Sequence, residues 1–132
     1  MEKLMCIGRD NVERKFECTI EKNTLDGTYD IMVQPVPPKS DPNYELRLKE
    51  QEDGNLRIIS VTHHGLEVYK EKGIIDALIP SLAKELDADI VSSPRTDKDD
   101  TGTFRTCAAD KYWERLRGRG MATYDSAKDI YT

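Results

Sequence analysis

The stretch KEKGII (residues 70–75) decides the expected fold, because a strand pattern ends before it and a helix pattern begins within it. The apolar run LRIISV (residues 56–61) precedes it, and apolar residues recur at helical spacing from Ile75 to Leu86. A basic turn with a glycine between a strand and a helix is typical of phosphate-binding sites, because the first helical amides lack partners within the helix. We therefore expect an anionic, nucleotide-like cofactor to bind at this turn.

The residues before this unit predict a meander of antiparallel strands. Residues 15–20 alternate between apolar and polar side chains, and residues 29–33 follow a turn and return beside them. Residues 44–48 and the run from Leu56 continue the pattern. Between them, residues 34–42 contain four prolines, so we expect an extended connector that joins neither a helix nor a sheet ladder.

The second half of the chain changes to helices and short strands. A buried strand is predicted at residues 89–93, and a second helix begins after Thr106, a plausible N-cap, and ends near Gly118. A closing strand pair follows at residues 122–124 and 130–131. We therefore predict an α+β fold with a mixed, mainly antiparallel sheet, two main helices and one parallel strand pair joined by a right-handed crossover.

Length and composition limit the classes to which the chain can belong. Its 132 residues suffice for one domain, residues 1–132, and no apolar run approaches the roughly 18 residues that span a bilayer. The net charge of −5 argues against general nucleic-acid binding. Three cysteines without CxxC spacing indicate free thiols and a cytoplasmic location, and their spacing predicts no metal site.

Two segments resemble parts of the GNAT superfamily of acyl-CoA N-acyltransferases. In that family an Arg/Gln-x-x-Gly-x-Gly/Ala turn opens a helix and binds the pyrophosphate of coenzyme A. Lys70, Gly73 and Ile75 stand at its three defining positions, and ADKYWERL, from Ala109, resembles the family's Ala-x-x-Phe-Tyr-Glu-Lys-Leu helix. The resemblance covers residues 56–124 and implies a single GNAT-like domain that uses acetyl-CoA or another acyl-CoA as cosubstrate.

The resemblance also implies where the cofactor would bind. The preceding strand of such proteins supplies backbone amides to the thioester carbonyl, a role that falls here on His63, His64 and Gly65, with the glycine allowing a bulge. The expected cofactor-binding residues are Gly65, Lys70, Glu71, Lys72, Gly73, Ile74 and Ile75.

Acyl transfer to an amine further requires a base for the ammonium group and a proton for the departing thiolate. His63 and His64 are the only histidines, and an imidazole near neutral pH suits the role of base. Because neighbours on a strand point to opposite faces, we expect only one of them to face the cleft. Glu67 is a second candidate base, acting through water, and Tyr112 is the candidate proton donor.

Other interpretations of these residues stay open. The histidines are also typical of a strand end, Glu67 of a solvated loop, and Tyr112 of an apolar core. Ile75 replaces a small residue of the family's turn, Trp113 stands where the family has a tyrosine, and residues 34–43 leave no room for the family's two N-terminal helices. These departures favour a GNAT-like binding or adaptor domain without acetyl transfer, and an unrelated α+β structural protein is a third reading.

The expected partner of an active enzyme is an amine-bearing small molecule or protein acceptor. Neither a membrane nor a nucleic acid is expected as a partner, and a homodimer stays open. Arg115, Arg117 and Arg119 form a basic cluster that suits an RNA surface, but the acidic balance of the chain favours a charged helix end.

Overall fold

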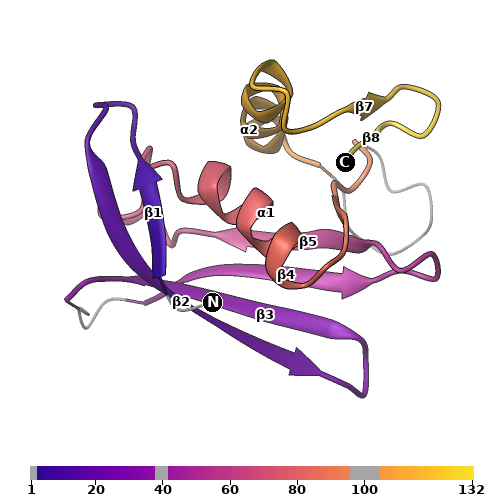
Figure 1. Cartoon of the computed structure of the whole chain (residues 1–132), viewed down its shortest axis with the longest axis horizontal. Coiled ribbons are helices and arrows are strands. Elements are labelled where there is room, and N and C mark those ends of the chain that lie inside the picture. The colour runs from indigo at the N-terminus through magenta and orange to yellow at the C-terminus, as the bar shows by residue number, and fades with distance from the viewer. Residues whose placement is uncertain (1–2, 38–41, 96–104) are drawn as a thin grey trace.

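Six strands form one curled sheet in the order in which they occur along the chain (Figure 1). The computed structural model describes residues 3–37, 42–95 and 105–132. Neighbouring strands are antiparallel except the last pair, which is parallel. The strands are β1 (Lys3–Ile7), β2 (Glu13–Asn23), β3 (Thr28–Pro35), β4 (Tyr44–Glu50), β5 (Leu56–Thr62) and β6 (Ile90–Val91). The predicted α+β class and its single parallel pair are confirmed.

Two helices and a small hairpin complete the chain. The helix α1 (Ile74–Glu85) connects β5 to β6, and α2 (Cys107–Gly118) lies beside its N-terminal half (Figure 1). The strands β7 (Tyr124–Asp125) and β8 (Ile130–Tyr131) form a separate antiparallel pair, as the sequence predicted. None of the helices in the described part of the chain combines the length and apolarity needed to cross a membrane.

The helix α1 forms because its apolar residues repeat on one face. Ile75, Leu78, Ile79 and Leu82 are buried against the sheet, and each fully buried side chain of this size stabilises the fold by about 1.5–3 kcal/mol. Pro80 lies inside the helix, which nevertheless continues to Glu85. The apolar face is therefore strong enough to keep the helix intact across a proline.

The turn before α1 is docked onto the end of β1, a strand that the sequence analysis missed. Gly73 has a φ of 76°, and a Cβ atom there would lie 2.1 Å from the carbonyl oxygen of Ile7. The amide of Arg9 also donates to the carbonyl oxygen of Glu71 at 3.0 Å. A glycine is therefore required at position 73 so that the backbone of β1 can pack against the turn, whether or not a ligand binds there.

The proline-rich connector differs from the prediction at its start. Gln34 and Pro35 belong to β3, and Pro35 stands opposite Phe16 of β2. A proline at the end of a strand costs little stability, because its missing N–H removes no hydrogen bond from the middle of the sheet. The prediction that this segment takes no part in the sheet is wrong for these two residues, and residues 38–41 lie outside the described part of the chain.

Candidate functional site

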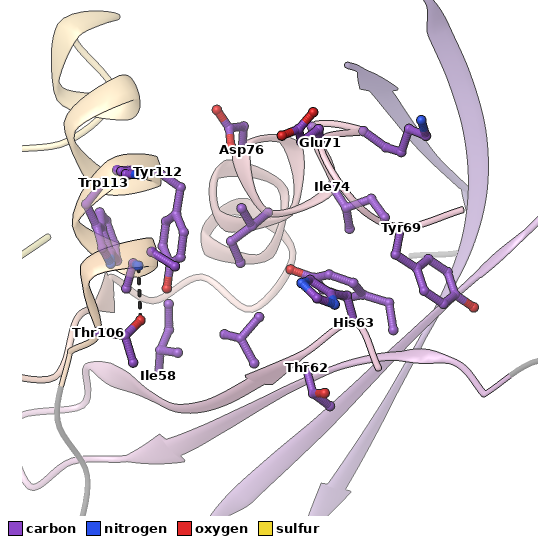
Figure 2. Close-up of a pocket in the computed structure, with 18 of the residues that line it drawn as sticks. Ile58, Thr62, His63, Tyr69, Glu71, Ile74, Asp76, Thr106, Tyr112 and Trp113 are labelled. Carbon is purple, nitrogen blue, oxygen red and sulfur yellow. Dashed lines mark hydrogen bonds between the residues drawn. The ribbon is translucent and has the colours of Figure 1, made fainter. Parts of the chain in front are cut away.

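A cleft of about 810 Å³ opens where β5 and β6 separate (Figure 2). The two strands pair only at Leu56 with Ile90 and Arg57 with Val91, whereas β5 continues beside β4 as far as Thr62. One wall of the cleft is therefore the second half of β5. The first turn of α1 and the first two turns of α2 form the others.

A β-bulge shapes the β5 wall of the cleft. Leu48 stands opposite Ile58 and Arg47 stands opposite Ser60, so Ile59 has no counterpart on β4. Ile59 lines the cleft. The residue before it, Ile58, accepts a hydrogen bond of 2.7 Å at its carbonyl oxygen from the hydroxyl of Ser93, which follows β6. A bulge beside a cleft re-aims backbone groups. The sequence analysis placed this bulge near Gly65, which instead lies in a turn after β5.

The start of α1 has no side-chain cap, in contrast to the start of α2. Gly73 is the N-cap of α1, and the Ala77 amide donates to the Gly73 carbonyl oxygen at 3.1 Å. Thr106 caps α2, because its hydroxyl accepts from the Ala109 amide at 3.2 Å, as the sequence predicted. The first amides of α1 are therefore available to an anion in the cleft.

Two lysines line the cleft. Lys72 precedes the helix, and Lys111 projects from α2. Within the described part of the chain, neither lysine forms a hydrogen bond or an ion pair. Both charges, together with the positive end of the α1 dipole, are available to an anionic ligand.

The two carboxylates that line the cleft are already paired with arginines. Asp76 receives bonds of 2.7 Å from Nε and NH2 of Arg115, and this bonding raises the pKa of Arg115 above its ordinary value. Glu71 pairs with Arg9 at 2.8 Å. Arg119 also approaches Asp76, at 3.5 Å. Arg115 and Arg119, at the end of α2, therefore join the two helices. This agrees with the interpretation of the basic cluster as a charged helix end.

Both histidines belong to the lining of the cleft. The ring of His64 lies beside Glu45, an exposed residue of β4, so the prediction that only one histidine side chain faces the cleft stays a prediction. β5 ends at Thr62, and His64 has a φ of 56°, which breaks the alternation of an extended strand. Nδ1 of His63 accepts from the Gly65 amide at 2.8 Å, so the neutral ring carries its hydrogen on Nε2. Nε2 of His64 lies 3.6 Å from Oε2 of Glu45.

Tyr112 enters the same cleft from α2, at the opposite end of the β5 wall. Figure 2 shows Tyr112 over Ile58, and His63 beside Tyr69. His63 stands five positions after Ile58 along the chain, which corresponds to about 16 Å in a strand. Burial raises the pKa of Tyr112, while the neighbouring Trp113 opposes the rise. The tyrosine therefore stays a neutral hydroxyl at working pH.

The remaining expected site residues divide between the cleft and the surface. Glu67 and Lys70 do not line the cleft and face each other across 3.7 Å, with the Glu67 side chain 90% exposed. The other expected catalytic and cofactor-binding residues all line the cleft: His63, His64, Gly65, Glu71, Lys72, Gly73, Ile74, Ile75 and Tyr112.

In the described part of the chain, no three His, Cys, Asp or Glu side chains gather as potential metal ligands. No protein-family model, no curated protein and no solved structure matches the chain. The function is therefore argued from the cleft and its residues.

Proposed function

We propose that this chain is a GNAT-like protein whose cleft binds acetyl-CoA or another acyl-CoA, and that it transfers the acyl group to a primary amine. One observation carries the proposal: the uncapped start of α1, Lys72 just before it and Lys111 on α2 line one cleft at the fork between β5 and β6. The proposed phosphate site at the start of α1 and the β5 wall thus belong to one cleft. The resemblance of residues 70–75 and 109–116 to acyl-CoA N-acyltransferases supports the same ligand.

The phosphates of the cofactor would bind at the start of α1. Its first amides and the two lysines supply positive charge, and Asp76 and Glu71 contribute little opposing charge because arginines hold them. Lys72 supplies charge on the β1 side, and Lys111 supplies it from α2. The rest of the cofactor would then extend along β5 toward the fork.

The acyl group would react beside the bulge of β5. A neutral amine nitrogen attacks the thioester carbonyl, a C–N bond forms, and the carbonyl oxygen carries the negative charge of the tetrahedral intermediate. The C–S bond then breaks, and the proton lost by the amine balances the proton gained by the thiolate. Backbone amides displaced by the bulge at Ile59 are suited to stabilise that oxygen, and the Tyr112 hydroxyl at the fork is the proposed proton donor to sulfur.

His64 is the stronger of the two histidine candidates for the base. Nδ1 of His63 is already occupied by the Gly65 amide, so its Nε2 presents a hydrogen instead of a lone pair. In His64, Glu45 faces Nε2, and no hydrogen bond within the described residues reaches Nδ1. Nδ1 is thus the atom that could accept a proton from the amine, with Glu45 orienting the ring.

A second candidate function is acyl-CoA binding without transfer, in an adaptor domain. The observation that favours it is that His63 and Tyr112 lie at opposite ends of the β5 wall, where the backbone from Ile58 to His63 spans about 16 Å if extended. A base and a proton donor so far apart do not act on one acyl group without an intervening water chain. In this second function the phosphate site still binds acyl-CoA, but no acyl group is transferred.

Mass spectrometry of an amine panel incubated with acetyl-CoA separates the two functions. Transfer predicts acetylated amine and free thiol in equal amounts, with His64→Gln losing roughly 10²-fold or more in rate and His63→Gln losing less. Both variants should bind acetyl-CoA like the parent. Binding of acetyl-CoA without any acetylated amine would establish the adaptor, and full turnover by His64→Gln would remove it from the role of base.

A further inference from the structure

Tyr44, the first residue of β4, lines the cleft and has no role in the proposed reaction. The next residue, Glu45, pairs with Thr62 at the end of β5, so the Tyr44 backbone lies at the histidine end of the β5 wall. The Tyr44 side chain shares the inner face of the sheet with Leu46, which belongs to the core. Only 4% of Tyr44 is exposed, so its side chain projects into the interior.

The hydroxyl of Tyr44 forms no hydrogen bond with any residue in the described part of the chain. The ring of Tyr69 meets the Tyr44 ring edge to face, with the centroids 5.9 Å apart, but the Tyr69 hydroxyl donates to the Pro42 carbonyl oxygen at 2.8 Å. Among the described residues, no tyrosine hydroxyl is both sealed from solvent and without a partner. The unpartnered Tyr44 hydroxyl is therefore open to the cleft that its side chain lines. Because a buried tyrosine hydroxyl usually has a hydrogen-bond partner, a ligand in the cleft is the expected one.

The electrostatic surroundings of Tyr44 place its hydroxyl near both helices. Burial raises the pKa of Tyr44 well above its ordinary value. Tyr112 on α2 and Asp76 on α1 raise that pKa further, and both residues line the cleft. The side chain thus reaches from the histidine end of the β5 wall toward Tyr112, and it stays a neutral hydroxyl at working pH.

We propose that the Tyr44 hydroxyl donates a hydrogen bond to the thioester carbonyl oxygen of the bound acyl-CoA. This inference rests on the proposed function. Tyr112 is the proposed proton donor to the sulfur, and the carbonyl carbon of a thioester is bonded to both its sulfur and its oxygen. A second hydroxyl near Tyr112 is therefore suited to reach that oxygen. The bond from Tyr44 would strengthen as negative charge develops on the oxygen, while the tyrosine keeps its proton.

The ratio of the affinities for acetyl-CoA and coenzyme A isolates this bond, because the two ligands differ only in the acetyl group. Tyr44→Phe keeps the ring and removes the hydroxyl. Its affinity for acetyl-CoA should fall by about tenfold in calorimetric titrations, while its affinity for coenzyme A stays unchanged. Tyr69→Phe is the matched control, because the hydroxyl that it removes binds Pro42, so the ratio should equal that of the parent chain.

Tyrosine labelled with ¹³C at the ring carbon that bears the hydroxyl gives a second measurement. In Tyr112→Phe, which lacks the other hydroxyl proposed beside the thioester, acetyl-CoA should move one tyrosine resonance that coenzyme A leaves in place. If Tyr44→Phe does not fold, this resonance decides, and its absence overturns the inference.

The same titrations separate failure of this inference from failure of the proposed function. Binding of both ligands with an unchanged affinity ratio in Tyr44→Phe overturns this inference alone. Absence of binding heat from both acetyl-CoA and coenzyme A in the parent chain overturns the proposed function and this inference together.

Discussion

Asp76 in the first turn of α1 receives two hydrogen bonds of 2.7 Å from the guanidinium group of Arg115 on α2. The carboxylate is 8% exposed, whereas the Arg115 side chain is 44% exposed. The pair joins the two helices that border the cleft, and it neutralises a carboxylate that would otherwise repel an anion at the start of α1. One ion pair therefore serves both the packing of the helices and the charge of the site.

Arg115→Ala should lower the free energy of unfolding by about 1–3 kcal/mol, because it leaves Asp76 buried with only the longer contact from Arg119. Urea unfolding of parent and variant measures this difference. Arg117→Ala is the matched control on the same helix, since Arg117 is exposed and meets Glu114 at only 3.5 Å. Equal losses in the two variants would show that the Asp76 contact contributes no more than a surface pair.

Gly73→Ala should destabilise the fold by about 1–3 kcal/mol more than Gly120→Ala does. Both glycines have positive φ, of 76° and 73°, so the backbone strain is shared. Only at Gly73 would the new Cβ meet the carbonyl oxygen of Ile7, whereas the space beside Gly120 is open. Thermal unfolding of both variants tests this contact, and matching melting temperatures would mean that β1 moves aside without cost.

Lys111→Ala should weaken the binding of coenzyme A by about threefold at low ionic strength, because an exposed lysine contributes a screened charge. Lys84→Ala, in the last turn of α1, is the control and should bind like the parent. Calorimetric titrations at low and high salt measure both effects. The difference between Lys111→Ala and the parent should shrink as salt increases, and a salt-independent difference would point to lost packing.

Asp129 should make the stability of the chain depend on pH below about 5. The hydrogen bond from Arg105 lowers the pKa of Asp129 below its ordinary value, against the opposing effect of burial. In acid the unfolded chain therefore binds a proton before the folded chain does, so stability is present above the unfolded pKa of about 3.9 and is lost below it.

Urea unfolding at several pH values tests this sign. Asp129→Asn should be less stable than the parent at neutral pH, and the two should converge in acid. The control, Asp89→Asn, replaces an exposed carboxylate that forms no ion pair within the described residues and should follow the parent curve. A constant gap between Asp129→Asn and the parent at all pH values would contradict the assigned cause.

The sequence predicted the elements that have a strong period or a recognisable end. Thr106 as the N-cap of α2 and the apolar face of α1 are confirmed, because capping and amphipathic spacing are local properties. β1 escaped prediction although its five residues alternate in burial. A strand that short becomes evident only through its pairing with β2 and its contact with Gly73.

The site was predictable in its residue types and less so in its arrangement. Residues 71–75 of the basic turn, the histidines and Tyr112 line one cleft, but the distance between its two ends depends on how far β5 runs past β6. The bulge at Ile59 arises from the register between β4 and β5, and the sequence of β5 alone does not reveal that register.

Calorimetric titration of the chain with acetyl-CoA tests the central claim, that the cleft between β5 and β6 binds an acyl-CoA, most directly. We predict saturable heat with a stoichiometry of about one, together with a melting temperature that rises with ligand concentration. Lys111→Ala should reduce the affinity in the same titration. No heat and no rise in melting temperature at millimolar acetyl-CoA would contradict the claim.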